Sequence, residues 1–285
     1  MTRTLLAATL ALTACSNPPT PEAPASPDPG SESASLTMKM TVAADIPWKP
    51  ASPKKPNGVQ MYAVDGNPAE GAFTAVLEVP GGHANPLHKH SANTTAVVLA
   101  GTVHFGRSAD DNQTLPAGSA WTVPAGEIHF GKCASEEPCQ IFIAMDGKME
   151  TIVAEDPHEG EMKGKVLPAA KLEWKKMKPD NPKSPEIVVL DGDMKKGPFK
   201  ALARLPVGFD SGLHSHTANF SAAIITGTLR RGKDAASGVQ PSTGSVWTQP
   251  GGEVHMDSCV SEEEPCHIVL VMDGAMDRIK APAQN

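Results

Sequence analysis

The sequence is poor in large aromatic side chains and has no long apolar run. It contains one tyrosine, seven phenylalanines and four tryptophans among 285 residues, against 25 glycines and 27 prolines. Few rings and many turn-forming residues disfavour a helical bundle or a coiled coil. No stretch reaches the roughly 20 apolar residues that a membrane-spanning helix needs. The composition therefore favours short strands joined by turns.

Basic side chains are too few for a nucleic-acid partner. Lysine and arginine together number 25 against 32 acidic residues, which gives a formal net charge of −7. A protein that binds nucleic acid needs a basic surface to neutralise phosphates. Nucleic acid is therefore excluded as a partner.

The N-terminus has the pattern of a secretory signal. Arg3 supplies one positive charge, an apolar run follows over residues 5–12, and Leu-Thr-Ala-Cys ends at Cys15. These four residues resemble a bacterial lipobox, which implies that residues 1–14 are removed and the Cys15 thiol is lipidated. Because Ser16, not aspartate, follows, the resemblance implies a periplasm-facing lipoprotein of the outer membrane. The alternatives are an ordinary signal peptide and an apolar start that arose by chance.

A proline-rich segment follows the predicted lipidation site. Residues 15–37 consist mostly of Pro, Ser, Glu and Ala, so they cannot bury enough surface to offset the entropy of ordering. We expect an extended tether, and we expect contact with the membrane only through the lipidated N-terminus. Export would also place the four remaining cysteines in an oxidising compartment.

The sequence repeats itself after 126 residues. A period this long indicates a duplicated domain. We therefore predict two domains, over residues 38–156 and 164–281. The coinciding positions include Trp48 with Trp174, Gly101 with Gly227, Trp121 with Trp247, Pro124 with Pro250, and Cys133 with Cys259.

Short apolar runs separated by turns recur within each half. Residues 73–79, 95–99 and 140–145 form such runs in the first half, and residues 222–225 and 267–272 form them in the second. Strands of this length and spacing indicate an antiparallel sandwich or barrel. The predicted fold class is therefore all-β, with one sandwich or barrel in each half.

Each half carries a His-x-His pair and a third histidine 39 positions after the pair ends. Residues i and i+2 of a strand point to one face, and the third histidine follows a Pro-x-Gly turn that can start a facing strand. Three converging imidazoles form a divalent-metal site with open coordination positions. A hydrogen-bonded polar cluster is the alternative. The residues are His88, His90 and His129, and His214, His216 and His255.

These motifs resemble those of the cupin superfamily, G-x5-H-x-H-x3-E-x6-G and G-x5-P-x-G-x2-H-x3-N. Their glycines, prolines and histidines occur in both halves, and the resemblance spans about residues 40–280. It implies a bicupin of two jelly-roll, or double-stranded β-helix, barrels. The sequence is also similar to a bacterial bicupin family of unknown function, from which no activity follows.

Thr94 and Phe220 replace the glutamate of the first cupin motif. Each site is therefore expected to hold its metal with three histidines, which suit Fe, Zn, Mn, Ni and Cu alike. This difference, together with His83 where the second half has Phe209, predicts that the first site is more polar. If only one half is catalytic, we expect it to be the first.

Two repeated glutamates, Glu127 and Glu253, stand two residues before the third histidine. If the strand has begun there, each glutamate points into the site as a fourth ligand or a general base. If the turn persists, each faces solvent or makes a turn hydrogen bond. Asn93 and Asn219, three residues after the His-x-His pair, are expected to brace a strand or loop.

Cys133 and Cys259 stand where the second cupin motif ends in asparagine, and Cys139 and Cys266 follow after short polar loops. Four cysteines allow three pairings. Export and duplication favour the disulfides Cys133–Cys139 and Cys259–Cys266. A thiolate ligand at Cys133 is the alternative.

Two classes of function fit these features. The first is a metal-dependent enzyme for a small molecule, namely a dioxygenase or a related isomerase or lyase. The second is a non-catalytic module of the cell envelope that binds a metal or a small molecule. The cupin fold hosts both classes, and neither the substrate nor the oligomeric state follows from the sequence. Candidates for a polar lining are Arg107, Arg204, Arg230 and Arg231, whose directions the sequence leaves open.

Overall fold

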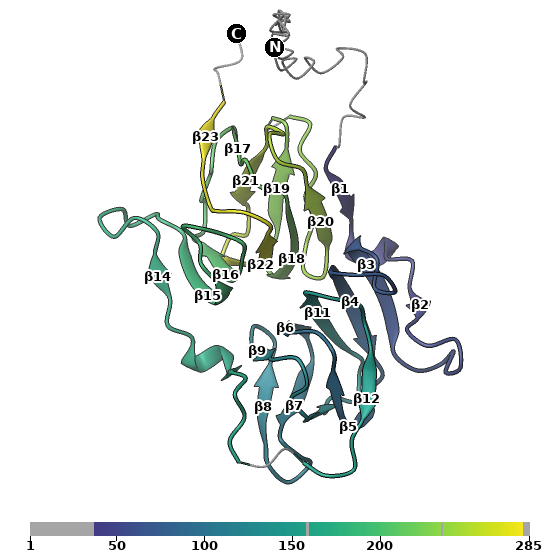
Figure 1. Ribbon diagram of the computed structural model, residues 1–285. Helices are drawn as coiled ribbons and strands as arrows, with labels where there is room; N and C mark the ends of the chain where they lie inside the picture. Colours follow the sequence, from purple (N-terminus) through teal and green to yellow (C-terminus); the bar gives the residue numbers. More distant parts are fainter. Residues whose placement is uncertain (1–36, 158–159, 235, 282–285) are drawn as a thin grey trace, which may run out of the picture. The chain divides into compact units, whose positions relative to one another are not determined.

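The structure is a computed structural model that describes residues 37–157, 160–234 and 236–281 (Figure 1). These residues form 23 strands and two 3₁₀ turns, η1 (Ala43–Asp45) and η2 (Ala169–Lys171). The predicted all-β class is confirmed. No helix within these residues is long and apolar enough to cross a membrane. The predicted signal and Cys15 lie outside the described residues.

The first half builds two antiparallel sheets. A seven-stranded sheet has the order β13-β9-β6-β11-β4-β3-β2, and a five-stranded sheet has the order β12-β5-β10-β7-β8. The strands are β2 (Lys49–Pro50), β3 (Gln60–Gly66), β4 (Phe73–Val79), β5 (Ala84–His90), β6 (Thr94–Ala100), β7 (Thr102–Gly106), β8 (Asn112–Pro116), β9 (Ala120–Val123), β10 (His129–Cys133), β11 (Cys139–Met145), β12 (Thr151–Val153) and β13 (Val166–Leu167).

The second half repeats the seven-stranded sheet, whereas its second sheet is divided into two separate strand pairs. Its seven-stranded sheet has the order β1-β20-β18-β22-β16-β15-β14, and two further pairs are β17-β23 and β19-β21. The strands are β1 (Lys39–Thr41), β14 (Lys175–Lys176), β15 (Glu186–Gly192), β16 (Phe199–Leu205), β17 (His214–Ser215), β18 (Phe220–Thr226), β19 (Leu229–Gly232), β20 (Val246–Gln249), β21 (Met256–Cys259), β22 (Cys266–Met272) and β23 (Ile279–Lys280).

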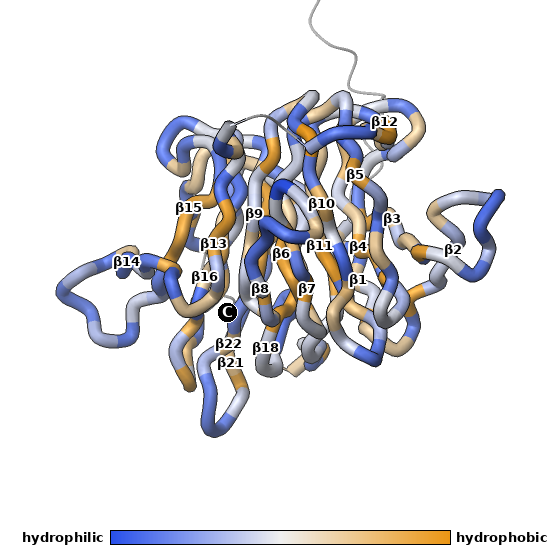
Figure 2. Tube along the Cα trace, turned by 90° about the horizontal axis from the view of Figure 1, so that it is seen from below, coloured by the Kyte–Doolittle hydropathy of each residue, from blue (hydrophilic) through white to orange (hydrophobic). Residues whose placement is uncertain are grey.

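Strand β11 illustrates why the central strands are apolar without alternation. Ile141 and Ile143 belong to the core inside the first barrel. Phe142, which points to the opposite side, belongs to a third cluster that also contains Leu202 and Val269 of the second half. Both faces of the seven-stranded sheet are thus buried. Figure 2 shows apolar residues along the strands and hydrophilic residues in the loops next to β2 and β14.

Two short strands cross from one half into the sheet of the other. Strand β1 pairs with β20, beside which it lies in Figure 1, and β13 pairs with β9. Residues 39–41 therefore complete the second sheet, and residues 166–167 complete the first. The predicted boundaries 38–156 and 164–281 stay a prediction, and neither range contains the whole of its seven-stranded sheet.

Both predicted disulfides, Cys133–Cys139 and Cys259–Cys266, are present. Cys133 ends β10, which begins with His129, and Cys139 begins β11 of the other sheet. The disulfide therefore ties the strand of the third histidine to the facing sheet. A thiolate ligand at Cys133 is wrong, because its sulfur is bonded to Cys139.

Candidate metal centres

The first barrel brings His88, His90 and His129 together. His88 and His90 lie on β5, and His129 begins β10 directly opposite His88. Their ring centroids lie between 4.3 and 5.2 Å apart. One ring nitrogen from each residue lies within 4.8 Å of the others. The structure therefore shows the convergence that the spacing predicts.

The second barrel repeats this group with His214, His216 and His255. His214 begins β17 and forms an antiparallel bridge with His255. The ring centroids lie between 4.4 and 5.4 Å apart, and one ring nitrogen of each again lies within 4.8 Å of the others. The two groups therefore have nearly the same geometry.

In all six rings Nδ1 is hydrogen-bonded to a backbone carbonyl oxygen. A carbonyl oxygen only accepts, so Nδ1 carries the hydrogen and Nε2 keeps its lone pair. Backbone carbonyls hold metal-ligating histidines in this way. The Nε2 atoms are therefore the available donors. In sequence order of the histidines, the acceptors belong to Pro86, Glu150, Glu127, Gly212, Asp277 and Glu253.

Burial lowers the pKa of five imidazoles and so favours their uncharged form; they belong to His88, His90, His129, His214 and His255. Loss of solvent contact lowers the pKa of His88, His90 and His214. Burial and then the neighbouring His88 lower the pKa of His129 to about 3, and burial and then Arg231 lower the pKa of His255 to about 4. Metals bind the neutral form of imidazole, so these rings are ready to ligate at neutral pH.

The donor set fits a divalent transition metal better than a polar cluster. Nε2 of His255 is buried without a hydrogen-bond partner, which is costly unless a ligand satisfies it. Among the described residues, no hydrogen bond joins the three rings of either group. Three neutral nitrogen donors suit a divalent metal with further positions left open.

The position of the missing glutamate supplies no carboxylate in either barrel. The buried hydroxyl of Thr94 has no hydrogen-bond partner and lies in the wall around the first group. The Phe220 ring lies 5.7 Å from the ring of His216 and 5.8 Å from that of His255. At these two positions the barrels therefore agree with the three-histidine expectation.

Glu127 and Glu253 hold the crossing strands. The carboxylate of Glu127 accepts hydrogen bonds from the amides of Lys163 and Gly164, just before β13. That of Glu253 accepts one from the amide of Met38, just before β1, at 2.7 Å. Neither carboxylate belongs to a histidine group. A catalytic role for the two glutamates stays a prediction, while their observed contacts are structural.

Asn93 and Asn219 brace loops, as expected. The Asn93 side chain donates to Asp146 at 2.6 Å and accepts from the amide of Ala125 at 2.9 Å. Asn219 makes the equivalent contacts with Asp273 and with the amide of Gly251. Each asparagine thus holds the turn that leads to the third histidine. The two partner aspartates also repeat in the sequence, but each is more than 50 residues from its asparagine, so no short motif predicts the contact.

A cavity of about 550 Å³ lies over the first group. The three histidines and Thr94 form its polar end, and its walls include Leu77, Phe105, Ile143 and Met149. Phe105 stacks on Trp121 with ring centroids 4.5 Å apart. The cavity therefore suits a small molecule with an apolar body and a polar head at the histidines.

The second barrel has an ion pair where the first has Phe105 and Gly131. Arg231 and Asp257 occupy the equivalent positions, and Arg231 is only 1% exposed. Its Nη1 donates to Oδ1 of Asp257. The expectation that the first site is more polar is therefore wrong, because this pair comes from β19 and β21 and not from the motif position. Aligning the two halves could have revealed the ion pair. The substitutions Phe105 to Arg231 and Gly131 to Asp257 fall on two positions that face each other on neighbouring strands.

One family model matches the chain twice, over residues 18–152 and 155–278, and is described as a domain of unknown function, DUF4437. Comparison with proteins of curated function finds no match.

Several solved structures share the fold. A candidate dioxygenase from Nostoc punctiforme is 16% identical, with a TM-score of 0.67, over 87% of this chain and 88% of that one. Oxalate decarboxylase from Lactobacillus farciminis is 13% identical, with a TM-score of 0.55, over 85% and 88%. Oxalate decarboxylase from Bacillus subtilis, which has Mn(II) centres, is 13% identical, with a TM-score of 0.55, over 86% and 80%. These likenesses confirm the fold of two cupin barrels.

Replacing Glu127 or Glu253 by glutamine should loosen the crossing strands and leave the metal bound. Glutamine removes the charge that strengthens the hydrogen bonds to the amides. We expect denaturant unfolding to show a loss of about 1–3 kcal/mol in each variant, and elemental analysis to show unchanged metal. The exposed Glu70 is the control, and Glu70→Gln should change stability by less than about 0.5 kcal/mol. Metal loss with unchanged stability would place these carboxylates at the metal instead.

The metal-free protein should lose stability as the pH falls. His129 and His255 have pKa values of about 3 and about 4 in the folded chain, against 6.5 for the ordinary side chain. Between these values the unfolded chain binds more protons, so the free energy of unfolding falls from about pH 6.5 towards about pH 4. Melting temperatures of chelator-treated protein measure this. A His129→Gln/His255→Gln variant with an equally steep pH dependence would contradict the assignment.

Proposed function

The chain belongs to the DUF4437 family and has two cupin barrels, and from the cavity over its first histidine group we propose that it is a metal-dependent bicupin that acts on a small molecule in its first barrel. That cavity supports the proposal because it joins a metal-binding polar end to an apolar enclosure of ligand size. We propose a dioxygenase-type reaction, and an isomerase or lyase reaction is the variant that needs no O₂.

The proposed cofactor is a divalent ion on Nε2 of His88, His90 and His129, and equally on the second group. Manganese and iron are the first choices, because imidazole suits both and the similarly folded oxalate decarboxylase of Bacillus subtilis has Mn(II) centres. When bound, such an ion supplies Lewis-acid polarisation of a substrate oxygen and, if redox-active, electrons.

Other groups of the first barrel would orient the histidines and bind the substrate. The backbone carbonyls of Pro86, Glu127 and Glu150 orient the three imidazoles. The unpartnered hydroxyl of Thr94 is available to the polar head of a substrate. Phe105, stacked on Trp121, provides a flat apolar wall, and its ring centroid lies 5.4 Å from that of His129. A planar molecule with an enol, ketone or carboxylate head fits this arrangement.

Thr94→Phe should block the first cavity while leaving its metal in place, because it introduces the residue that the second barrel carries there. We expect at least about a tenfold loss of turnover or binding, as when a buried polar contact is removed and its space filled. O₂ consumption and thermal shift with small diketones and dicarboxylates measure this.

The matched control for this variant is Phe220→Thr in the second barrel, which should leave both readouts unchanged. Loss of activity in Phe220→Thr but not in Thr94→Phe would contradict the assignment to the first barrel. Binding without turnover would support the alternative of a non-catalytic binding module.

We also propose that the chain is exported and held at the outer membrane through lipidated Cys15. The signal-like N-terminus supports this, as do the two disulfides, which persist in oxidising compartments. In a bacterial host the full chain should fractionate with membranes, and Cys15→Ala should lose this association. Unprocessed wild-type chain in the cytosolic fraction would contradict export, and release of the wild type into the periplasm would favour an ordinary signal peptide.

A further inference from the structure

The two barrels differ at one pair of facing positions beside the third histidine. In the first barrel, Phe105 on β7 faces Gly131 on β10. In the second, Arg231 on β19 faces Asp257 on β21. Each pair has the same place in its own barrel, 126 residues apart in the sequence. Only the second barrel therefore carries a carboxylate two residues after its third histidine.

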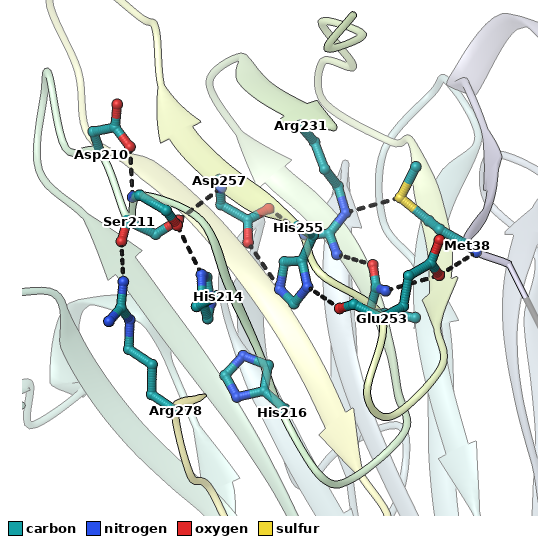
Figure 3. A network of polar contacts seen from close by, with 12 residues as sticks. Met38, Asp210, Ser211, His214, His216, Arg231, Glu253, His255, Asp257 and Arg278 are labelled. Atoms are coloured by element: carbon teal, nitrogen blue, oxygen red, sulfur yellow. Dashed lines mark hydrogen bonds and ion pairs between the residues drawn. The ribbon is translucent and has the colours of Figure 1, made fainter. Parts of the chain in front are cut away.

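That carboxylate lies beside one histidine, His255, and just outside the group of three ring nitrogens that lie within 4.8 Å of one another. Asp257 and His255 are separated by one residue, so their side chains lie on the same face. Oδ2 of Asp257 is 3.6 Å from Nε2 of His255 (Figure 3). This Nε2 is the buried atom that has no hydrogen-bond partner. A ligand placed there would therefore meet an imidazole nitrogen and a carboxylate oxygen together.

Arg231 fixes the orientation of the carboxylate. Its guanidinium pairs with the other oxygen, Oδ1, so the two oxygens of Asp257 have different neighbours. The guanidinium is itself held, because it lies 4.8 Å from the ring centroid of Trp247 and donates to Gln249 at 2.6 Å. Its Nε lies 3.2 Å from Sδ of Met38, the residue just before β1 (Figure 3). Metal-ligating carboxylates are commonly hydrogen-bonded in this manner.

We propose that Asp257 is the fourth donor of the second metal centre, with Arg231 as the residue that positions it. The first centre has three neutral donors only, because Gly131 has no side chain. An anionic oxygen donor strengthens the hold on a divalent ion and favours hard ions such as Mn²⁺. The second centre should therefore bind Mn²⁺ more tightly and fill first. The inference rests on the proposed function only in requiring that both groups bind a metal.

The test compares the centres one at a time in the full chain. His90→Ala disables the first centre and His216→Ala disables the second. Mn²⁺ is titrated into each metal-free variant against a competing chelator. We expect the second centre to bind at least about tenfold more tightly than the first, and Asp257→Asn in the His90→Ala chain to remove that advantage.

Two further variants keep the test decisive if Asp257→Asn unfolds, since it leaves the Arg231 charge buried without a partner. Arg231→Phe/Asp257→Gly gives the second barrel the pair of the first, and its affinity should fall to that of the first centre. Gly131→Asp in the His216→Ala chain should raise the affinity of the first centre. A Cβ at Gly131 meets only the Phe105 ring, at the ordinary contact distance of 3.9 Å, and Gly131 lines the cavity over the first group.

The outcomes separate the inference from the proposed function. Equal Mn²⁺ affinities at the two centres, unchanged by substitution at Asp257, would overturn the fourth-donor assignment and leave two metal-binding groups. No Mn²⁺ at either centre of a folded chain would overturn both. A changed electron paramagnetic resonance signal of bound Mn²⁺ on replacement of Asp257 is the supporting result that a purely structural role would not produce.

Discussion

The hydrogen bonds from histidine Nδ1 to backbone carbonyls are the constraint on which both sites depend. In the first barrel these carbonyls belong to Pro86, Glu127 and Glu150, which lie on three separate segments. Each segment must be held in place for the Nε2 atoms to converge. The disulfide at the end of β10 and the contact between Asn93 and Asp146 provide that support. The features that the two halves share are therefore parts of one frame around the histidine group.

The same frame encloses two different interiors. Both barrels contribute to one apolar cluster between the halves, which limits change on the outer faces of the central strands. Side chains that point into a barrel are less constrained, because they pack only against residues of the same barrel. One barrel stacks Phe105 on Trp121 and leaves a cavity. The other places Arg231 on Trp247 and pairs it with Asp257. After duplication, one histidine group therefore lies beside a cavity and the other beside a buried ion pair.

Local spacing made the histidine groups and the disulfides predictable. An i, i+2 pair on a strand, a turn before the third histidine and a short loop between cysteines all fix geometry within a few residues. The contacts of Glu253 were not predictable, because its partner Met38 is 215 residues away. The direction of Arg231 depends on the strand register opposite Asp257. The expectation about polarity failed because it compared Thr94 with Phe220 and His83 with Phe209, while the direction of Arg231 was left open.

The central claim is that each repeated histidine group holds one metal ion. Elemental analysis of the full chain and of the variants His90→Ala and His216→Ala tests it most directly. The account predicts close to two equivalents of a divalent transition metal in the wild type and one fewer in each variant. A folded wild-type chain that holds no metal even after reconstitution would contradict it and make the histidines a packing feature.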